Sequence, residues 1–291
     1  MQKIVTAALL AALIAGCSTS GPNTPADDAP PSAPLLTWDD VTDLPEPPPL
    51  PALPYGSDPQ QFGELRVPPG VDGPFPVLIL IHGDCWKTDE GMAYMRPLAH
   101  ALANLGVATW NIEYRRPTSG ADWSTAYSDV ALATDFLRTL AVAHSLDLKR
   151  VVSSGHAVGG QLAMWLATRP KLAKADPLYE VKPLPMQGVI GLAAVTRLPA
   201  AGDASGCPGI PADAKLPALR FPLGVPQWFV HGAQDALTPS DVVLKYAESA
   251  RKKGDKVTLG ITTNAGHFEP VAPTSSTWTA LQQAVIAALL Q

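Results

Sequence analysis

The chain has 291 residues, of which 16% are charged and 46% are hydrophobic, and it contains 31 prolines. This length accommodates one α/β domain of about 230 residues plus an extension. The charged fraction lies well below the roughly 25% of an average soluble protein, and it suits a parallel sheet covered on both faces, whose strands are continuous apolar runs. The net charge is −5 and no basic stripe is evident, which argues against nucleic-acid binding.

The first 17 residues have the pattern of a signal peptide. Lys3 precedes an apolar run over residues 4–15 that is too short for a permanent transmembrane helix. The run ends in Leu-Ile-Ala-Gly-Cys17, which resembles a bacterial lipobox, and this resemblance implies that Cys17 is acylated and begins the mature chain. Ser18 then favours the outer membrane, so we expect a lipid-anchored envelope protein facing the periplasm. The alternative is an ordinary secretory signal with a chance cysteine.

Residues 18–60 are rich in proline and acidic side chains. Seven of the 26 acidic residues lie between residues 21 and 60, where there is no Lys or Arg. Such a segment buries too little apolar surface to offset the entropy of ordering it. We therefore expect a tether that holds the domain away from the membrane. The alternative is that Trp38 and the apolar patch at 50–55 dock on the domain as a strap.

Residues 61–291 alternate between strand and helix patterns. Apolar runs predict strands at 61–67, 75–83, 107–114, 151–156, 186–195, 225–231 and 256–263, and helical periodicity predicts helices at 94–105, 123–144, 158–169, 240–253 and 276–290. This alternation implies right-handed crossovers and a mostly parallel sheet with helices on both faces. A Pro/Gly-rich insertion at 196–222 is expected to form a small cap.

The sharpest motif follows the strand at 151–156. The pentapeptide Gly155-His156-Ala157-Val158-Gly159 resembles the G-x-S-x-G nucleophile elbow of the α/β-hydrolases, in which a serine sits on a tight turn between strand and helix. Ala157 occupies the nucleophile position and has no hydroxyl with which to attack. Efficient hydrolysis by the usual covalent route is therefore not expected of this sequence.

A second motif ends the strand at 75–83. His82-Gly83-Asp84-Cys85-Trp86 resembles the H-G-G-x-W loop of kynurenine formamidases and related small esterases. The resemblance implies an oxyanion hole made by backbone N–H groups of Gly83, Asp84 and Val158. Asp84 replaces the second glycine, and a carboxylate beside a developing oxyanion opposes the transition state unless it points away. This departure is independent of Ala157.

The acid and base positions of the resemblance are both filled. Asp235 follows the strand at 225–231 and His267 follows the strand at 256–263, in the order nucleophile, acid, histidine that α/β-hydrolases use. The alternative for Asp235 is a cap on the helix that begins near residue 240. His82 and His231 are expected to be structural, and His156 is expected to line the elbow. Glu113 is expected to pair with an arginine, Arg115 or Arg116.

The cysteines leave two further alternatives open. Cys85 lies close to the predicted site and is a conceivable nucleophile. With Cys17 acylated, Cys85 and Cys207 form an even pair in an oxidising compartment, so a disulfide between them could fix the cap over the pocket.

Taken together, residues 61–291 resemble the α/β-hydrolases, nearest to small carboxylesterases and kynurenine-formamidase-like enzymes. The resemblance implies a small ester or N-formyl amide as ligand and no cofactor, and no metal-ligand motif is present in the sequence. We expect a serine-hydrolase relative that is inactive or weakly active because of Ala157. The alternatives are an active esterase whose serine was deliberately replaced, and a non-catalytic envelope protein that binds partners.

Overall fold

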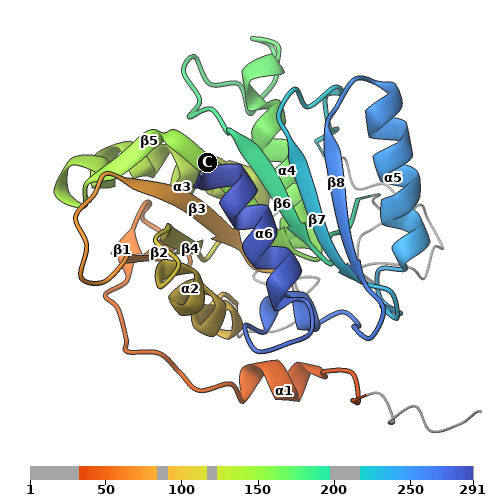
Figure 1. The fold of residues 1–291 in the computed structure, drawn as a ribbon. Helices are drawn as coiled ribbons and strands as arrows, with labels where there is room; N and C mark the ends of the chain where they lie inside the picture. The colour runs from red at the N-terminus through yellow and green to blue at the C-terminus, as the bar shows by residue number, and fades with distance from the viewer. Residues whose placement is uncertain (1–32, 84–90, 117–122, 197–216, 291) are drawn as a thin grey trace, which may run out of the picture. The chain divides into compact units, whose positions relative to one another are not determined.

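One sheet of eight strands organises the molecule (Figure 1). The computed structural model describes residues 33–83, 91–116, 123–196 and 217–290, and the account that follows concerns these residues. The strand order is β1-β2-β4-β3-β5-β6-β7-β8. The strands are β1 (Leu53–Pro54), β2 (Phe62–Arg66), β3 (Phe75–Ile81), β4 (Ala108–Ile112), β5 (Leu146–His156), β6 (Gly188–Leu192), β7 (Gln227–Gly232) and β8 (Val257–Thr262).

The sheet is parallel from β4 to β8, whereas β2 runs antiparallel to both β1 and β4. Strand β3 lies between β4 and β5, and all seven of its residues are buried. This arrangement confirms the predicted mostly parallel α/β sheet. The carboxyl ends of the parallel strands lie at one edge, which is where ligands bind in such sheets.

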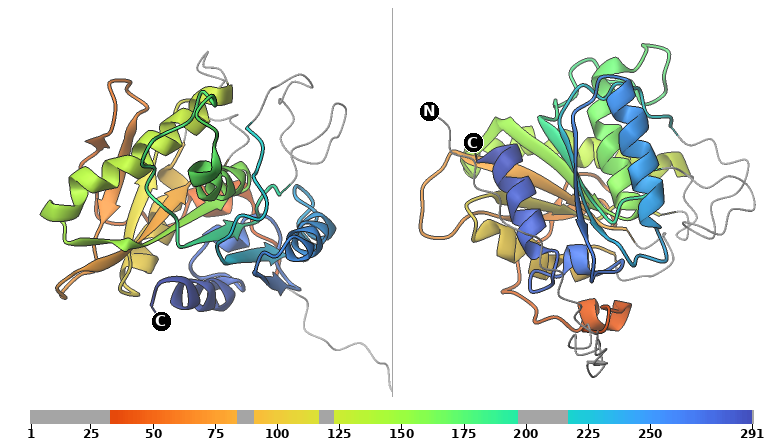
Figure 2. Two further views of the ribbon diagram at one scale, coloured as in Figure 1. Left: turned by 90° about the horizontal axis from the view of Figure 1, so that it is seen from above. Right: turned by 45° about the vertical axis from the view of Figure 1, so that its right-hand side comes forward.

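Helices cover both faces of the sheet (Figures 1 and 2). Because side chains alternate along a strand, Val77, Ile79 and Ile81 of β3 join the apolar cluster that includes residues of α3, α4 and α5. Leu78 and Leu80 join a second cluster with residues of α2 and α6. The helices are α2 (Arg96–Ala103), α3 (Trp123–Ala143), α4 (Val158–Thr168), α5 (Ser240–Lys252) and α6 (Trp278–Leu289).

The predicted strands and helices of the domain are all present, with shifted ends. The largest shift is in β5, which begins at Leu146 rather than at residue 151. Leu146 pairs with Phe75 of β3, and the register then shifts before Val77 pairs with Val151. Asp147, Lys149 and Arg150 are polar and not buried, so this part of the strand lacks the continuous apolar run of residues 151–156.

The segment before residue 61 belongs in part to the folded domain. The compact unit that contains the sheet begins at Ala33. A short helix, α1 (Trp38–Thr42), carries a capping box between Thr37 and Asp40, and its Val41 is 1% exposed. Residues 33–60 therefore do not form the predicted free tether, because a few apolar side chains in this proline-rich stretch pack on the domain. Residues 18–32 lie outside the described residues.

No helix in the described ranges is long and apolar enough to cross a membrane. The predicted signal segment, 1–17, lies outside those ranges.

Candidate active site

Ala157 is the single residue between the end of β5 and the start of α4. Its backbone has φ 50° and ψ −117°, a positive-φ conformation that a non-glycine residue rarely adopts and that costs about 1–3 kcal/mol. Hydrogen bonds hold this backbone on both sides: its N–H donates to Leu192 O at 3.0 Å, and its C=O accepts from the N–H groups of Gly160 and Val195. The turn between β5 and α4 is therefore strained at Ala157, whose side chain carries no hydroxyl; its assignment as the nucleophile position stays a prediction.

The two glycines of the elbow are required by close backbone approach. A Cβ on Gly155 would lie 2.1 Å from the carbonyl oxygen of Gly159, and a Cβ on Gly159 would lie 2.1 Å from that of Ile81. Either contact is far inside van der Waals distance and involves backbone that cannot move aside. The G-x-x-x-G spacing of the motif thus reflects how tightly α4 packs against β5 and β3.

Asp235 and His267 form a hydrogen-bonded pair at the carboxyl edge of the sheet. His267 follows β8 and Asp235 follows β7, and His267 Nδ1 lies 2.9 Å from Asp235 Oδ2. Because the carboxylate accepts, Nδ1 carries the proton and Nε2 is left with the lone pair that a general base needs. The structure therefore brings together the two residues that the sequence assigns as acid and base.

Three further hydrogen bonds fix the Asp235 carboxylate. Oδ1 accepts the N–H groups of Leu237 and Thr238 at 2.9 and 2.8 Å, and Oδ2 accepts the Thr238 hydroxyl at 2.6 Å. Burial alone would raise the pKa of Asp235, but the hydrogen bonds and charge of His267 and the hydrogen bonds from Thr238 outweigh it and leave the pKa below its ordinary value. The carboxylate is held ionised and immobile, as an orienting acid requires. His231 Nε2 is 3.7 Å from the same carboxylate and 2.7 Å from Thr238 O, which fits the structural role expected of it.

The predicted oxyanion hole is only partly described. Gly83 N–H donates to the Tyr94 hydroxyl at 2.8 Å, so this group is engaged inside the protein. The prediction that Gly83 N–H binds an oxyanion conflicts with this contact. Val158 is the first residue of α4, and its N–H therefore lacks a partner within the helix. Asp84, Cys85 and Cys207 lie outside the described residues, as does Cys17.

A hydrogen-bonded chain connects the loop at Gly83 with the loop at His267. Tyr94 Oη lies 2.9 Å from His156 Nδ1, and His156 Nε2 lies 3.1 Å from the carbonyl oxygen of His267. That carbonyl can only accept, so Nε2 is protonated, and the neutral ring accepts from Tyr94 at Nδ1. Burial and the nearby His267 lower the pKa of His156 to about 3, which keeps the ring neutral. His156 therefore lines the elbow and acts as a bridge between the two loops.

Glu113 pairs with His82 as well as with an arginine. Its Oε1 lies 2.9 Å from His82 Nε2 and 3.8 Å from Arg116 Nε. Burial would raise the pKa of Glu113, but His82, the Tyr114 N–H and Arg116 lower it to about 2. Arg115, the other predicted partner, instead forms a two-point contact with Asp129 at 2.9 and 2.7 Å.

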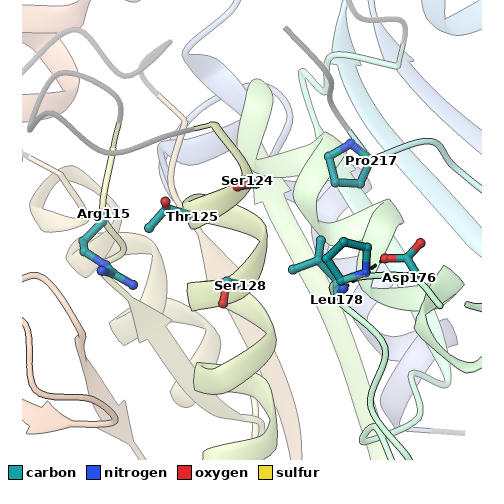
Figure 3. A pocket seen from close by; sticks show the side chains of 8 residues that line it. Arg115, Ser124, Thr125, Ser128, Asp176, Leu178 and Pro217 are labelled. Carbon is teal, nitrogen blue, oxygen red and sulfur yellow. Dashed lines mark hydrogen bonds between the residues drawn. The ribbon is translucent and has the colours of Figure 1, made fainter. Parts of the chain in front are cut away.

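A separate hollow lies between the first turns of α3 and the segment after α4 (Figure 3). It encloses about 480 Å³, and it is lined partly by hydroxyls and a carboxylate: its walls include Arg115, Thr125, Ser128, Asp176, Leu178 and Pro217. None of the residues assigned to the hydrolase site lines it. Since Asp129 already neutralises Arg115, the hollow offers hydroxyls rather than a free cation.

Within the described ranges, no group of three or more His, Cys, Asp or Glu residues is arranged to hold a metal ion.

Three residues that contribute to this region were not singled out from the sequence. Thr238 holds Asp235, Tyr94 joins Gly83 to His156, and Glu269 accepts the N–H of Gly266 beside His267 at 2.8 Å. Thr238 and Glu269 lie within three residues of the site residues they support, but one polar residue near a motif is too weak a signal to assign. Tyr94 gives no local signal, because it is distant in sequence from both of its partners.

Comparison with known proteins agrees with this geometry. Residues 64–201 match the BD-FAE family. Esterase EstD of Thermotoga maritima is 26% identical over 147 residues, which are 45% of this chain and 35% of that protein. The match thus spans about a third of the curated relative.

Two esterase structures share the fold over most of both chains. An acetyl ester-xyloside bifunctional hydrolase from Caldicellulosiruptor lactoaceticus superposes with a TM-score of 0.63 at 18% identity, covering 81% of this chain and 96% of its own. A thermophilic esterase from Thermogutta terrifontis gives a TM-score of 0.64 at 18% identity, covering 82% and 92%. The chain therefore has the fold of these α/β-hydrolase esterases, and its residues 64–201 are similar to the BD-FAE family.

Proposed function

We propose that this protein binds small esters or N-formyl amides and turns them over weakly or not at all, because Ala157 replaces the nucleophile. The observation that carries the proposal is the contrast at the carboxyl edge of the sheet. The Asp235–His267 pair has the hydrogen-bond geometry of a catalytic acid and base. The turn between β5 and α4, where the nucleophile is expected, carries only the methyl group of Ala157.

The size of the expected loss follows from how such triads work. Removing the serine from a triad that acts as a unit lowers turnover by about 10⁶, and about 10³–10⁴ over the uncatalysed reaction remains from the rest of the site. His267 could activate a water molecule directly, since its Nε2 has the free lone pair. With Gly83 N–H engaged by Tyr94, fewer donors are left to stabilise an oxyanion, so this route is expected to be slow.

The ligand class extends to esters of carbohydrates. One of the similar structures is described as an acetyl ester-xyloside bifunctional hydrolase and another as a carbohydrate esterase from gut microbiota. An acetylated sugar is a small ester within the proposed class. It is the second ligand to test after simple esters and an N-formyl aromatic amine.

The test is to restore the hydroxyl. Hydrolysis of a short-chain nitrophenyl ester, an N-formyl aromatic amine and an acetylated sugar is measured for the unmodified protein and for Ala157→Ser. We expect almost no turnover from the former and a gain of at least about 10³ from the latter, since serine, His267 and Asp235 would then act together. The control is the double variant Ala157→Ser/His267→Ala, in which the gain should disappear.

Other outcomes would redirect the proposal. Efficient turnover by the unmodified protein would contradict it and would direct attention to Cys85. If Ala157→Ser is folded but hydrolyses none of the three substrates, ligand binding is measured next by competition with a fluorescent ester. Absence of binding as well would favour the alternative of an envelope protein that kept the fold and uses its surface for partners.

We also propose that Cys17 is acylated and anchors the protein in the bacterial envelope, on the periplasmic side of the outer membrane. The support is the signal pattern of residues 1–17 and the Ser18 that follows. Cells fed labelled palmitate should incorporate label into the unmodified protein and not into Cys17→Ser. Membrane fractionation would then place it, and label in Cys17→Ser would contradict this assignment.

A further inference from the structure

One buried carboxyl group joins the N-terminal segment to the loop that carries His267. Glu269 is 4% exposed and lies at the start of a short 3₁₀ helix, Glu269–Val271. Its Oε1 accepts the N–H of Leu36 at 2.7 Å, and its Oε2 accepts the N–H of Gly266 at 2.8 Å. Leu36 precedes α1, and Gly266 is the neighbour of His267. Both oxygens are thus used to connect residues that are 230 positions apart in the sequence.

A second, apolar contact joins the same two regions. The Trp38 ring lies 5.0 Å from that of Tyr94 and 5.9 Å from that of Phe268, measured between ring centroids. Phe268 follows His267, and Tyr94 holds both Gly83 N–H and His156. Trp38 therefore packs against Phe268, on the loop of His267, and against Tyr94, which bonds to both Gly83 and His156.

The fit between segment and loop is close. A Cβ on Gly266 would lie 3.2 Å from Leu35 Cδ1, so the Leu35 side chain would have to shift to admit a larger residue at this point. Leu36, Trp38 and Leu44 pack against the same apolar cluster as α2 and α6. The segment thus contacts the rigid face of the domain and the His267 loop together.

We infer that residues 35–44 are a brace for the hydrolase site, and that Trp38 and Glu269 are positioning residues that hold His267 in register with Asp235. The physical reason is that His267 lies on a loop, and a loop needs outside contacts to hold a 2.9 Å hydrogen bond in one geometry. Strand β8 fixes the start of that loop, and Glu269 and Phe268, through the N-terminal segment, fix its end.

The experiment uses the full chain and two spectroscopic readouts. The first is the low-field proton resonance of the His267 Nδ1–H that bonds to Asp235, assigned by its loss in His267→Ala. The second is the hydrogen-exchange rate of the Gly266 amide. Trp38→Ala removes the ring without touching Glu269. We expect it to accelerate Gly266 exchange at least tenfold and to broaden or remove the low-field resonance, and we expect Trp38→Phe to restore both.

Glu269→Gln tests the carboxyl group itself. In Glu269 each carboxylate oxygen accepts one N–H group, but a Gln side chain has a single oxygen. That oxygen can replace the acceptor for Leu36 or the acceptor for Gly266, and the other hydrogen bond is lost. We expect the resonance to weaken in this variant too. The matched control is Glu248→Gln on the exposed face of α5, where Glu248 contacts Lys252, and it should change neither readout.

A general loss of stability must be separated from a loss of bracing. Val285→Ala on α6 truncates a fully buried side chain of the same apolar cluster and leaves the side chains of the segment and the loop unaltered. At equal free energy of unfolding, Trp38→Ala must affect Gly266 and His267 more than Val285→Ala does. Trp38→Ala could leave Gly266 exchange and the His267 resonance unchanged, or change them only as much as Val285→Ala does. In either case the segment packs on the domain without positioning His267, and the inference is wrong.

Discussion

Two carboxylate–histidine pairs among the described residues have the same length but different surroundings. His82 Nε2 lies 2.9 Å from Glu113 Oε1, and His267 Nδ1 lies 2.9 Å from Asp235 Oδ2. Both histidines follow parallel strands at the carboxyl edge of the sheet. In a list of distances alone, either pair could be taken for the acid and base of a hydrolase.

The two pairs differ in the surroundings of the histidine nitrogen that does not contact the carboxylate. The His82 side chain is fully buried and stacks on Tyr114, and its Nδ1 has no hydrogen-bond partner among the described residues. Glu113 is used as a structural hub that also accepts the N–H groups of Met92 and Tyr114. The His267 side chain is 10% exposed, and its remaining nitrogen is the one that an orienting carboxylate leaves free. Accessibility, and not the length of the hydrogen bond, marks the pair suited to chemistry.

The largest expected effect separates the pairs by activity. In the Ala157→Ser background, His267→Ala should lower turnover by about 10⁴ or more, because the serine would lose its base. Glu113→Gln in the same background should keep turnover per folded molecule within about tenfold. Steady-state rates, corrected for the folded fraction from circular dichroism, measure both. Equal losses of turnover in the two variants would contradict the assignment of the His267 pair to chemistry and the Glu113 pair to structure.

Stability should rank the pairs in the opposite order. Glu113→Gln leaves a buried histidine and Arg116 without their carboxylate, and breaking a buried pair in this way costs about 3–5 kcal/mol. Asp235→Asn keeps a side-chain oxygen for the N–H groups of Leu237 and Thr238, so we expect a cost of about 1 kcal/mol. Urea unfolding at neutral pH gives both free energies. A larger cost for Asp235→Asn would contradict the assignment of Glu113 as the structural hub.

The low pKa of Glu113 predicts acid sensitivity. The folded-state pKa of about 2 lies below the ordinary value of 4.5, so the unfolded chain binds the proton more readily between these values. The stabilisation is complete above about pH 4.5 and is lost as the pH falls toward 2, by roughly 3 kcal/mol in total. Unfolding free energies measured from pH 6 to pH 2 should fall along this window, and Glu113→Gln should flatten the decline. A decline of the same size in that variant would show that other carboxyl groups cause it.

The smallest effect concerns the elbow itself. Ala157→Gly removes the Cβ from a residue at φ 50° and should relieve about 1 kcal/mol or more of strain, while the unfolded chain gains up to about 1 kcal/mol in entropy. We expect the variant to be as stable as the unmodified protein or up to about 1 kcal/mol more stable. Ala163→Gly, inside α4, is the matched control and should destabilise by about 1 kcal/mol or more, because glycine disfavours a helix interior. Equal destabilisation by both would mean that the elbow is not strained.

Local sequence patterns predicted most strands and helices of the domain. Apolar runs at 75–83 and 151–156 and the helical periodicity at 123–144 predicted β3, β5 and α3, because burial on both faces leaves a continuous signal in the sequence. The elbow, Asp235 and His267 were found for a similar reason. Each follows a strand directly, so the parallel sheet brings them to one edge.

Residue types at local spacings were enough to predict the strand–helix order, the missing hydroxyl at Ala157 and the positions of Asp235 and His267, the proposed acid and base. Three features are visible only in the folded chain: residues 33–60 pack on the domain, Gly83 N–H donates to Tyr94, and Glu113 pairs with His82. Those contacts join segments far apart in the chain, and they depend on which side chains become buried together. A proline-rich composition predicts a free tether until the domain offers Trp38 and Val41 an apolar surface to cover, and only the folded domain presents that surface.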